Sequence, residues 1–155
     1  LTIRHELGMN HLARLLILAQ LASNRGPGTR LDARIQAVID YLNLHLSEPL
    51  SVGELADAAH ISESHLAHLF REQVGVPPKR FIEMRKMQRA MDLLISTNRP
   101  IGQIANDVGF DNAFHFSARF RRCAGCSPRK LRQNPTRRSE CYAHLIHASG
   151  LQEQK

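Results

Sequence analysis

The sequence predicts an all-α fold in which two helix-turn-helix units are joined by a long connecting helix. Apolar residues recur at three- and four-residue spacing along most of the 155-residue chain, which is the period of an amphipathic helix. The order of short helix, tight turn and longer helix occurs twice, and this order is the helix-turn-helix plan. Two copies are too few for a solenoid, so the repeat indicates a pair of such units.

The two copies can be aligned almost residue for residue. In the short helices, Leu55-Ala56 corresponds to Ile104-Ala105 at a separation of 49 residues. The longer helices correspond at a separation of 50 residues, so one residue has been inserted in the second turn. These later pairs are Leu66 with Phe116, Phe70 with Phe120, Arg71 with Arg121, Val74 with Ala124, Gly75 with Gly125 and Pro78 with Pro128.

Caps, prolines and glycines mark the boundaries of the predicted helices. Ser51 and Glu54 form a capping box, in which each side chain accepts a bond from the other residue's free backbone N–H. Ser62, Asp111 and Ser127 are the predicted caps of three later helices. The predicted elements are a helix at 31–47, a first unit at about 51–75, a connecting helix at about 78–96, a second unit at about 99–125 with Gly109 in its turn, and a last helix after Ser127.

The compact domain is predicted at 31–133, with different structure on either side. Residues 10–22 carry an apolar helical stripe, which would pack on a neighbouring domain or form a dimer seam. Residues 23–29 are rich in turn-forming residues and are predicted to be a linker. Residues 134–155 carry no cap or apolar period, so a flexible tail is expected there.

Composition favours an intracellular protein with a polyanionic partner. The chain is 43% hydrophobic, which suffices for a modest core, and its net charge of +7 favours nucleic acid over an acidic small molecule. Its three cysteines are an odd number, which fits a reducing compartment and hence a cytoplasmic location. The most apolar stretch, Leu15 to Leu21, is too short to span a bilayer, so no membrane partner is expected.

Charge is distributed very unevenly along the predicted domain. Residues 31–78 hold two basic and seven acidic residues, a net charge of −5. Residues 79–132 hold twelve basic and four acidic residues, a net charge of +8. Attraction to phosphate is therefore expected mainly from the connecting helix, the second unit and the last helix.

The outward faces of the two longer helices carry the candidate DNA contacts. A helix in the major groove reads bases through short groups near its N-terminus and is anchored to phosphate by arginine or lysine. For the histidines, the alternative is a solvated helix face without a partner. The predicted base-reading residues are Ser64, His65, His68, Asn112, Phe114, His115 and Ala118. The predicted phosphate contacts are Arg71, Lys79, Arg80, Arg119, Arg121, Arg122, Arg129 and Lys130.

The aromatic residues divide into core and surface positions on the same helical geometry. Phe70, Phe110, Phe116 and Phe120 are predicted to be core residues rather than stacking platforms for single strands. Phe114 points outward, where its ring could meet a thymine methyl group.

The residues around both turns resemble the AraC/XylS family of bacterial transcription regulators. The resemblance covers residues 31 to about 133 and is carried by Ser62 through Phe70, Gly75, Ile104-Ala105, Val108-Gly109-Phe110, Phe116, Phe120, Gly125, Ser127 and Pro128. It implies a chain that binds double-stranded DNA through two helix-turn-helix units and, often, activates transcription. The family often has an arginine after the serine of the second recognition helix. Here that position is Ala118, and neighbouring Arg119 is the expected substitute.

Longer members of that family carry an N-terminal effector-binding and dimerisation domain. Residues 1–30 are similar to the junction in those members, so the resemblance implies a homodimer controlled by a small molecule, such as a sugar. It also implies RNA polymerase as a partner and requires no cofactor.

A metal-binding or cysteine-reactive module is the alternative interpretation. Cys123-x-x-Cys126 and Cys141-x-x-His144 have the ligand types and the pair spacing of a structural zinc site. Against it, Cys123 lies on the inward face of its helix, where a free thiol packs well, and Cys126 lies in a turn. No metal site is expected on that ground, and because no recognisable base or oxyanion pair accompanies these cysteines, no enzymatic activity is expected either.

Overall fold

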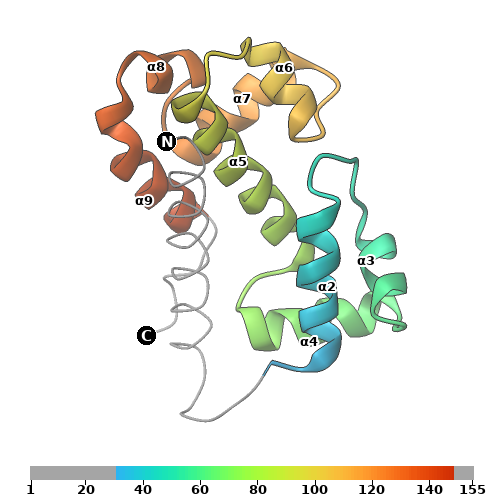
Figure 1. Cartoon of the computed structure of the whole chain (residues 1–155). Helices are drawn as coiled ribbons and strands as arrows, with labels where there is room; N and C mark the ends of the chain where they lie inside the picture. The colour runs from blue at the N-terminus through green and yellow to red at the C-terminus, as the bar shows by residue number, and fades with distance from the viewer. Residues whose placement is uncertain (1–30, 149–155) are drawn as a thin grey trace, which may run out of the picture.

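The computed structural model describes residues 31–148, and in that range the chain is helical without a strand (Figure 1). The all-α fold class is thereby confirmed. The helix predicted at 10–22 and the linker at 23–29 lie outside the described residues. In the described part, no helix is long and apolar enough to cross a membrane.

The first unit consists of α2 (Ala33–Leu44), α3 (Val52–Ala58) and α4 (Glu63–Val74). The capping box of Ser51 and Glu54 is present and opens α3. Ser62 caps α4, because its Oγ accepts a bond of 3.3 Å from the backbone N–H of His65. These sequence predictions are confirmed.

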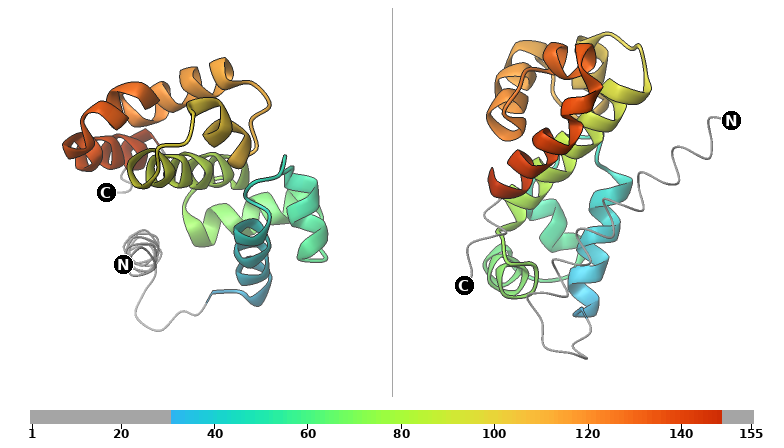
Figure 2. Two further views of the ribbon diagram at one scale, coloured as in Figure 1. Left: turned by 45° about the horizontal axis from the view of Figure 1, so that its top comes forward. Right: turned by 90° about the vertical axis from the view of Figure 1, so that its left-hand side faces the viewer.

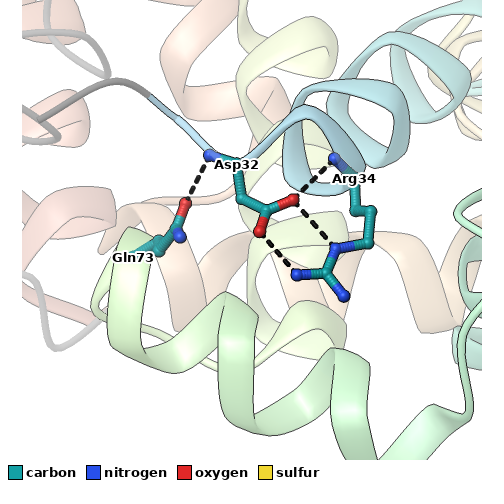
Figure 3. Close-up of polar contacts among 3 residues, drawn as sticks. All are labelled: Asp32, Arg34 and Gln73. Atoms are coloured by element: carbon teal, nitrogen blue, oxygen red, sulfur yellow. Dashed lines mark hydrogen bonds and ion pairs between the residues drawn. The ribbon is translucent and has the colours of Figure 1, made fainter.

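A cluster at the start of α2 ties the unit together (Figure 3). Asp32 caps α2 by accepting a 2.9 Å bond from the backbone N–H of Arg34, and its carboxylate also holds the Arg34 guanidinium at 2.7 Å. The backbone N–H of Asp32 donates to Oε1 of Gln73 in α4, 2.9 Å away. The start of α2 is therefore fixed against the reading helix of its own unit.

The connecting helix α5 (Pro78–Ser96) leads to the second unit, which consists of α6 (Ile101–Asp107), α7 (Ala113–Ala124) and α8 (Pro128–Gln133). Figures 1 and 2 show the first unit gathered at one end of α5 and the second unit at the other. Gly75 and Gly125 end α4 and α7 in the left-handed conformation, at equivalent places in the repeat.

The cap of α7 was predicted one residue too early. The structure places Asn112 at the cap, where its Oδ1 accepts bonds from the backbone N–H groups of Phe114 at 2.8 Å and His115 at 3.2 Å. Asn112 corresponds to Ser62 in the first unit, so Asp111 is the residue inserted in the second turn. Asn112, and not the inserted Asp111, therefore occupies the cap position that Ser62 has in the first unit.

The expected flexible tail is wrong for residues 135–148. A 3-10 turn at Pro135–Arg137 leads into α9 (Arg138–Ala148), which packs against α7 and α5. Cys141 and Leu145 are buried there. Asp92 of α5 accepts bonds from the Tyr142 hydroxyl at 2.8 Å and from Arg138 at 3.0 Å, and so ties α9 to the connecting helix.

Aromatic side chains fill the core of both units. Phe70 meets Phe81 of α5 edge-on with ring centroids 5.2 Å apart, and Phe116 contacts Phe120 at 5.7 Å. Phe110 is half-buried and packs edge-on against Phe116. The core positions predicted for Phe70, Phe116 and Phe120 are confirmed, since all three are fully buried.

Candidate nucleic-acid interface

The exposed face of α4 carries the residues predicted to read bases in the first unit. Ser64, His65, His68 and Arg71 are all exposed, while Leu66 of the same helix is fully buried in the core. Spacings of three and four residues place Ser64, His68 and Arg71 in one row along the helix. The row therefore offers hydroxyl and imidazole groups near the N-terminus and a guanidinium in the last turn.

The exposed face of α7 repeats this arrangement with different chemistry. Phe114, His115, Ala118 and Arg121 occupy the positions of Ser64, His65, His68 and Arg71, each 50 residues further along the chain. All four are exposed, and the side chain of Phe114 reaches 78% exposure. The face of α7 therefore offers apolar contact where that of α4 offers polar groups.

Asn112 is placed differently from the other predicted base-reading residues. Its Oδ1 is engaged in capping α7, as described above, which leaves its amide NH₂ for an external acceptor. The structure therefore gives this side chain a positioning task at the start of the reading helix.

Four predicted phosphate contacts lie at equivalent places after the two reading helices. Lys79 and Arg80 stand in the first turn of α5, and Arg129 and Lys130 stand in the first turn of α8. All four are exposed, and none has an ion-pair partner within residues 31–148. The N-terminus of a helix as long as α5 carries partial positive charge, so cations placed there are unfavourable on their own. A bound anion at that end would interact favourably with both the helix dipole and the two cations.

Arg119 is directed back into the protein. Its Nε lies 2.5 Å from Oε1 of Glu83 in α5, whereas Nη2 of Arg122 lies 3.7 Å from the same oxygen. The Arg122 side chain is 67% exposed, and Arg121 is exposed with no partner in the described part of the chain. Glu83 therefore fixes α7 to the connecting helix through Arg119 and leaves Arg121 and Arg122 facing solvent.

The first unit offers little positive charge of its own. Of its two basic residues before α5, Arg34 is held by Asp32 (Figure 3), and its hydrogen bond lowers the pKa of Asp32 to about 2. Arg71 is thus the one basic residue in 31–78 without a carboxylate partner in the described structure.

The cysteines of the alternative zinc interpretation do not converge on one site in the described part of the chain. The Sγ of Cys123 lies 3.6 Å from Glu83, while Cys126 and Cys141 face one another. Residues 31–148 contain no group of three His, Cys, Asp or Glu side chains placed to hold a metal ion.

Comparison with known proteins identifies the family. A sequence model described as a helix-turn-helix domain matches residues 55–134. The arabinose operon regulatory protein of Salmonella typhimurium is 32% identical over 127 residues, which are 81% of this chain and 45% of that protein. The chain belongs to the AraC-type family of helix-turn-helix transcription regulators. A transcriptional activator of that family, RhaS of Klebsiella pneumoniae, is 30% identical over 77% of this chain and 43% of its own length.

Solved structures agree with the AraC-type assignment. The C-terminal domain of AraT, a response regulator from Geobacillus stearothermophilus, matches with a TM-score of 0.65 and 28% identity over 68% of this chain and 88% of that one. The DNA-binding domain of AdpA, solved in complex with a target DNA, matches with a TM-score of 0.62 and 25% identity over 68% of this chain and 94% of that one. The chain spans less than half the length of the two sequence relatives above.

The two units of this AraC-type chain meet at a buried lysine that sequence reasoning missed. Lys86 of α5 is 7% exposed, and its Nζ donates a 2.8 Å bond to the carbonyl of Glu48, which connects α2 and α3. Burial lowers the pKa of Lys86. A Cβ on Gly109, in the second turn, would lie 2.5 Å from that Nζ and 2.8 Å from the Glu48 carbonyl oxygen.

Lys86 therefore sits where the first unit, the connecting helix and the second turn touch. The sequence did contain a sign that Lys86 is buried, because this residue lies four positions from both Ile82 and Ala90 and so shares the apolar side of the helix. A second tie joins α5 to α2, because Arg85 donates a 2.8 Å bond to Oδ1 of Asn43. These contacts, together with the packing of α4 and α7 against α5, hold the two reading helices in relation to each other.

Proposed function

We propose that this AraC-type chain binds double-stranded DNA with α4 and α7 in two successive major grooves, and regulates transcription in this way. The observation that carries the proposal is that the repeat places exposed residues at equivalent positions of both helices and keeps a histidine (His65 and His115) and an arginine (Arg71 and Arg121) at two of them, which favours the same task for both helices. The AdpA DNA-binding domain, solved in complex with a target DNA, matches this chain in fold, which supports DNA binding by this chain.

The two helices are proposed to read different base edges. On α4, Ser64, His65 and His68 donate to or accept from the edges of bases in the groove. On α7, the Phe114 ring and the Ala118 methyl group contact thymine methyl groups, and His115 supplies a polar contact. Asn112 contributes its amide NH₂ while its oxygen caps the helix.

Phosphate is proposed to be bound on both sides of each reading helix. Arg71 and Arg121 act from the last turns of α4 and α7, with Arg122 beside the latter. The pairs Lys79-Arg80 and Arg129-Lys130 act from the helices that follow. Arg119, although expected among these contacts, is proposed instead to position α7 through Glu83.

The connecting helix suits this spacing. A helix of 19 residues is roughly 28 Å long at 1.5 Å per residue. When the thickness of the units at its two ends is added, the distance between the reading helices approaches the 34–36 Å of one DNA turn. One chain would then contact a site without two-fold symmetry, because its two reading helices differ in sequence.

The complete regulator is proposed to be an activator controlled by a small molecule, such as a sugar. The support is its likeness to a regulator named for the arabinose operon and to the activator RhaS, both matched over less than half their length. In this proposal residues 1–30 lead from an effector-binding and dimerisation domain, and the homodimer acts on RNA polymerase in the cytoplasm. We propose no enzymatic activity, no bound metal and no membrane partner for this protein.

Selection from a random duplex library tests DNA reading directly. The chain is incubated with duplexes carrying a random region of about 30 base pairs, which exceeds two groove contacts, and bound molecules are enriched over several rounds. We expect one asymmetric site, bound at least about 10³-fold more tightly than random duplex at physiological salt. Equal affinity for all sequences, or tighter binding to single strands, would contradict the proposal.

A further inference from the structure

Two buried thiols face one another behind the second reading helix. Cys126 lies in the turn between α7 and α8, and Cys141 lies in α9, fifteen residues further along the chain. Their sulfur atoms are 2.9 Å apart, and the residues are only 4% and 2% exposed. A disulfide bond is about 2.05 Å long, so closing this gap needs a movement of less than about 1 Å.

We infer that Cys126 and Cys141 are an oxidation site, a dithiol that closes to a disulfide when it meets a peroxide. The assignment rests on the geometry of the pair and goes beyond DNA binding. The two sulfurs come from different elements and are in contact with each other inside the core.

The chemistry balances with hydrogen peroxide as the two-electron oxidant. The Cys126 sulfur attacks one peroxide oxygen and gives up its thiol proton, the O–O bond breaks, and the sulfur becomes a sulfenic acid as the leaving hydroxide takes up that proton to form water. The Cys141 sulfur then attacks the Cys126 sulfur, the S–O bond breaks, and the hydroxyl leaves as a second water with the proton of Cys141. Two thiols and one peroxide thus give one disulfide and two waters.

The surroundings of the pair determine this order of events. Burial, followed by the contact with Cys126, raises the pKa of Cys141 to about 12, so Cys141 keeps its proton at neutral pH and acts second. The Arg137 guanidinium lowers the pKa of Cys141 and Glu140, bonded to Arg137 at 3.1 Å, raises it, but burial has the larger effect. The His144 ring packs closely against Gly125, the residue before Cys126, because a Cβ added to Gly125 would lie only 2.8 Å from a ring carbon of His144.

The third cysteine is a natural control. Cys123 is also buried, but its sulfur contacts Glu83 at 3.6 Å rather than another thiol. Burial and the Glu83 carboxylate both raise the pKa of Cys123. Peroxide should therefore leave Cys123 as the free thiol of the chain.

The bond would fasten α9 to the end of the second reading helix. Cys126 follows α7 directly, after Gly125, whereas α9 begins at Arg138, beyond the residues matched by the family model. In the reduced chain α9 is held by packing and by Asp92, and in the oxidised chain a closed loop of fifteen residues would hold it covalently. Loop closure restricts the unfolded chain, so oxidation should make the second unit more resistant to unfolding.

Mass spectrometry on the full chain tests the site. The reduced chain is treated with hydrogen peroxide and its intact mass is measured, and free thiols are then alkylated so that the peptide links can be mapped. We expect a loss of about 2 Da, reversed by dithiothreitol, with Cys126 linked to Cys141 and Cys123 alkylated. The variant Cys123→Ser should behave like the unaltered chain, whereas Cys126→Ala and Cys141→Ala should form no internal link.

Two results would overturn the inference. One is oxygen addition without a link in the unaltered chain, which needs no variant and holds even where the alanine variants fail to fold. The other is a link that includes Cys123. Thermal unfolding gives a second readout: the oxidised chain should melt several degrees higher than the reduced chain, because the cross-link restricts the unfolded chain. A disulfide that leaves the melting temperature unchanged would refute the fastening of α9.

Discussion

The two helix-turn-helix units share one turn geometry but place different residues in it. His60 and Gly109 occupy equivalent positions, and both adopt the left-handed conformation, with φ of 54° and 74°. In each unit the next residue's backbone N–H bonds the carbonyl five residues earlier, Ile61 to Ala56 at 3.0 Å and Phe110 to Ala105 at 2.9 Å. The exposed first turn tolerates a side chain in this strained conformation.

The second turn requires glycine for a further reason. Gly109 lies against the Glu48 carbonyl and the Lys86 ammonium, so a side chain would collide with the first unit. The difference between the two turns teaches that the second turn is also the joint between the units.

The units also differ in charge. Residues 31–78 carry a net charge of −5 and offer Arg71 to phosphate, with Lys79 and Arg80 following in α5, whereas the second unit offers Arg121, Arg122, Arg129 and Lys130. We interpret the second unit as the main electrostatic anchor and the first as a reader of bases that depends on it for affinity.

Substitutions in the two turns should have opposite signs. Gly109→Ala adds a Cβ at positive φ against a backbone carbonyl and should lower the free energy of unfolding by about 2–4 kcal/mol. His60→Gly removes the strain of the same backbone conformation at an exposed position, and it should raise the free energy of unfolding by less than about 1 kcal/mol. Urea denaturation of both variants measures the two changes, and a mild effect of Gly109→Ala would show that the units are not in contact there.

Lys86→Met should loosen the joint between the units. The substitution keeps the buried chain but leaves the Glu48 carbonyl without its donor, at a cost of about 1–3 kcal/mol in unfolding free energy. It should also reduce the penalty for inserting one base pair between the two halves of the selected DNA site. Arg89→Met, an exposed residue of the same helix, is the matched control. If both variants change the free energy of unfolding and the insertion penalty equally, Lys86 does not hold the two units together.

His68→Ala should affect base reading by the first unit alone. We expect a loss of about 1–3 kcal/mol on the selected site, relaxed base preference in one half of it, and almost unchanged affinity for random duplex. Competition binding with both duplexes measures the difference. If affinity for both duplexes falls equally, His68 is a phosphate contact or a structural residue.

Arg121→Ala and Arg119→Ala separate a phosphate contact from a structural one on a single helix. Loss of Arg121 should flatten the slope of log K against log salt by about one unit, on specific and random DNA alike. Loss of Arg119, which is paired with Glu83, should leave that slope almost unaltered and lower the melting temperature instead. Identical slopes for the two variants would undo the distinction between them.

Most helices could be predicted from the sequence because local chemistry determines them. Ser51 with Glu54, Ser62, and the prolines at 78 and 128 fix helix starts without reference to the rest of the chain. The inward and outward faces of α4 and α7 followed from apolar spacing in the same way. The family motif lies in these same positions, which is why the fold could be recognised early.

What could not be predicted depends on contacts between distant residues. Neighbouring Asp111 and Asn112 are both good caps, and only the register of the folded turn selects Asn112. Among the residues of α9 whose burial is described, Cys141 and Leu145 are buried, and α9 is tied to α5 by Asp92, fifty residues from Tyr142. Arg119 has a surface position by helical spacing, and its partner Glu83 comes from another helix.

The central claim is that one chain places two reading helices in two grooves. It is tested most directly by methylation-protection footprinting of the chain on the site selected from random duplexes. We expect two protected patches of major groove on one face of the DNA, roughly 10 base pairs apart, with the patch assigned to α7 persisting in Ser64→Ala/His68→Ala protein. A single protected groove, or a palindromic site covered by one chain, would contradict the account.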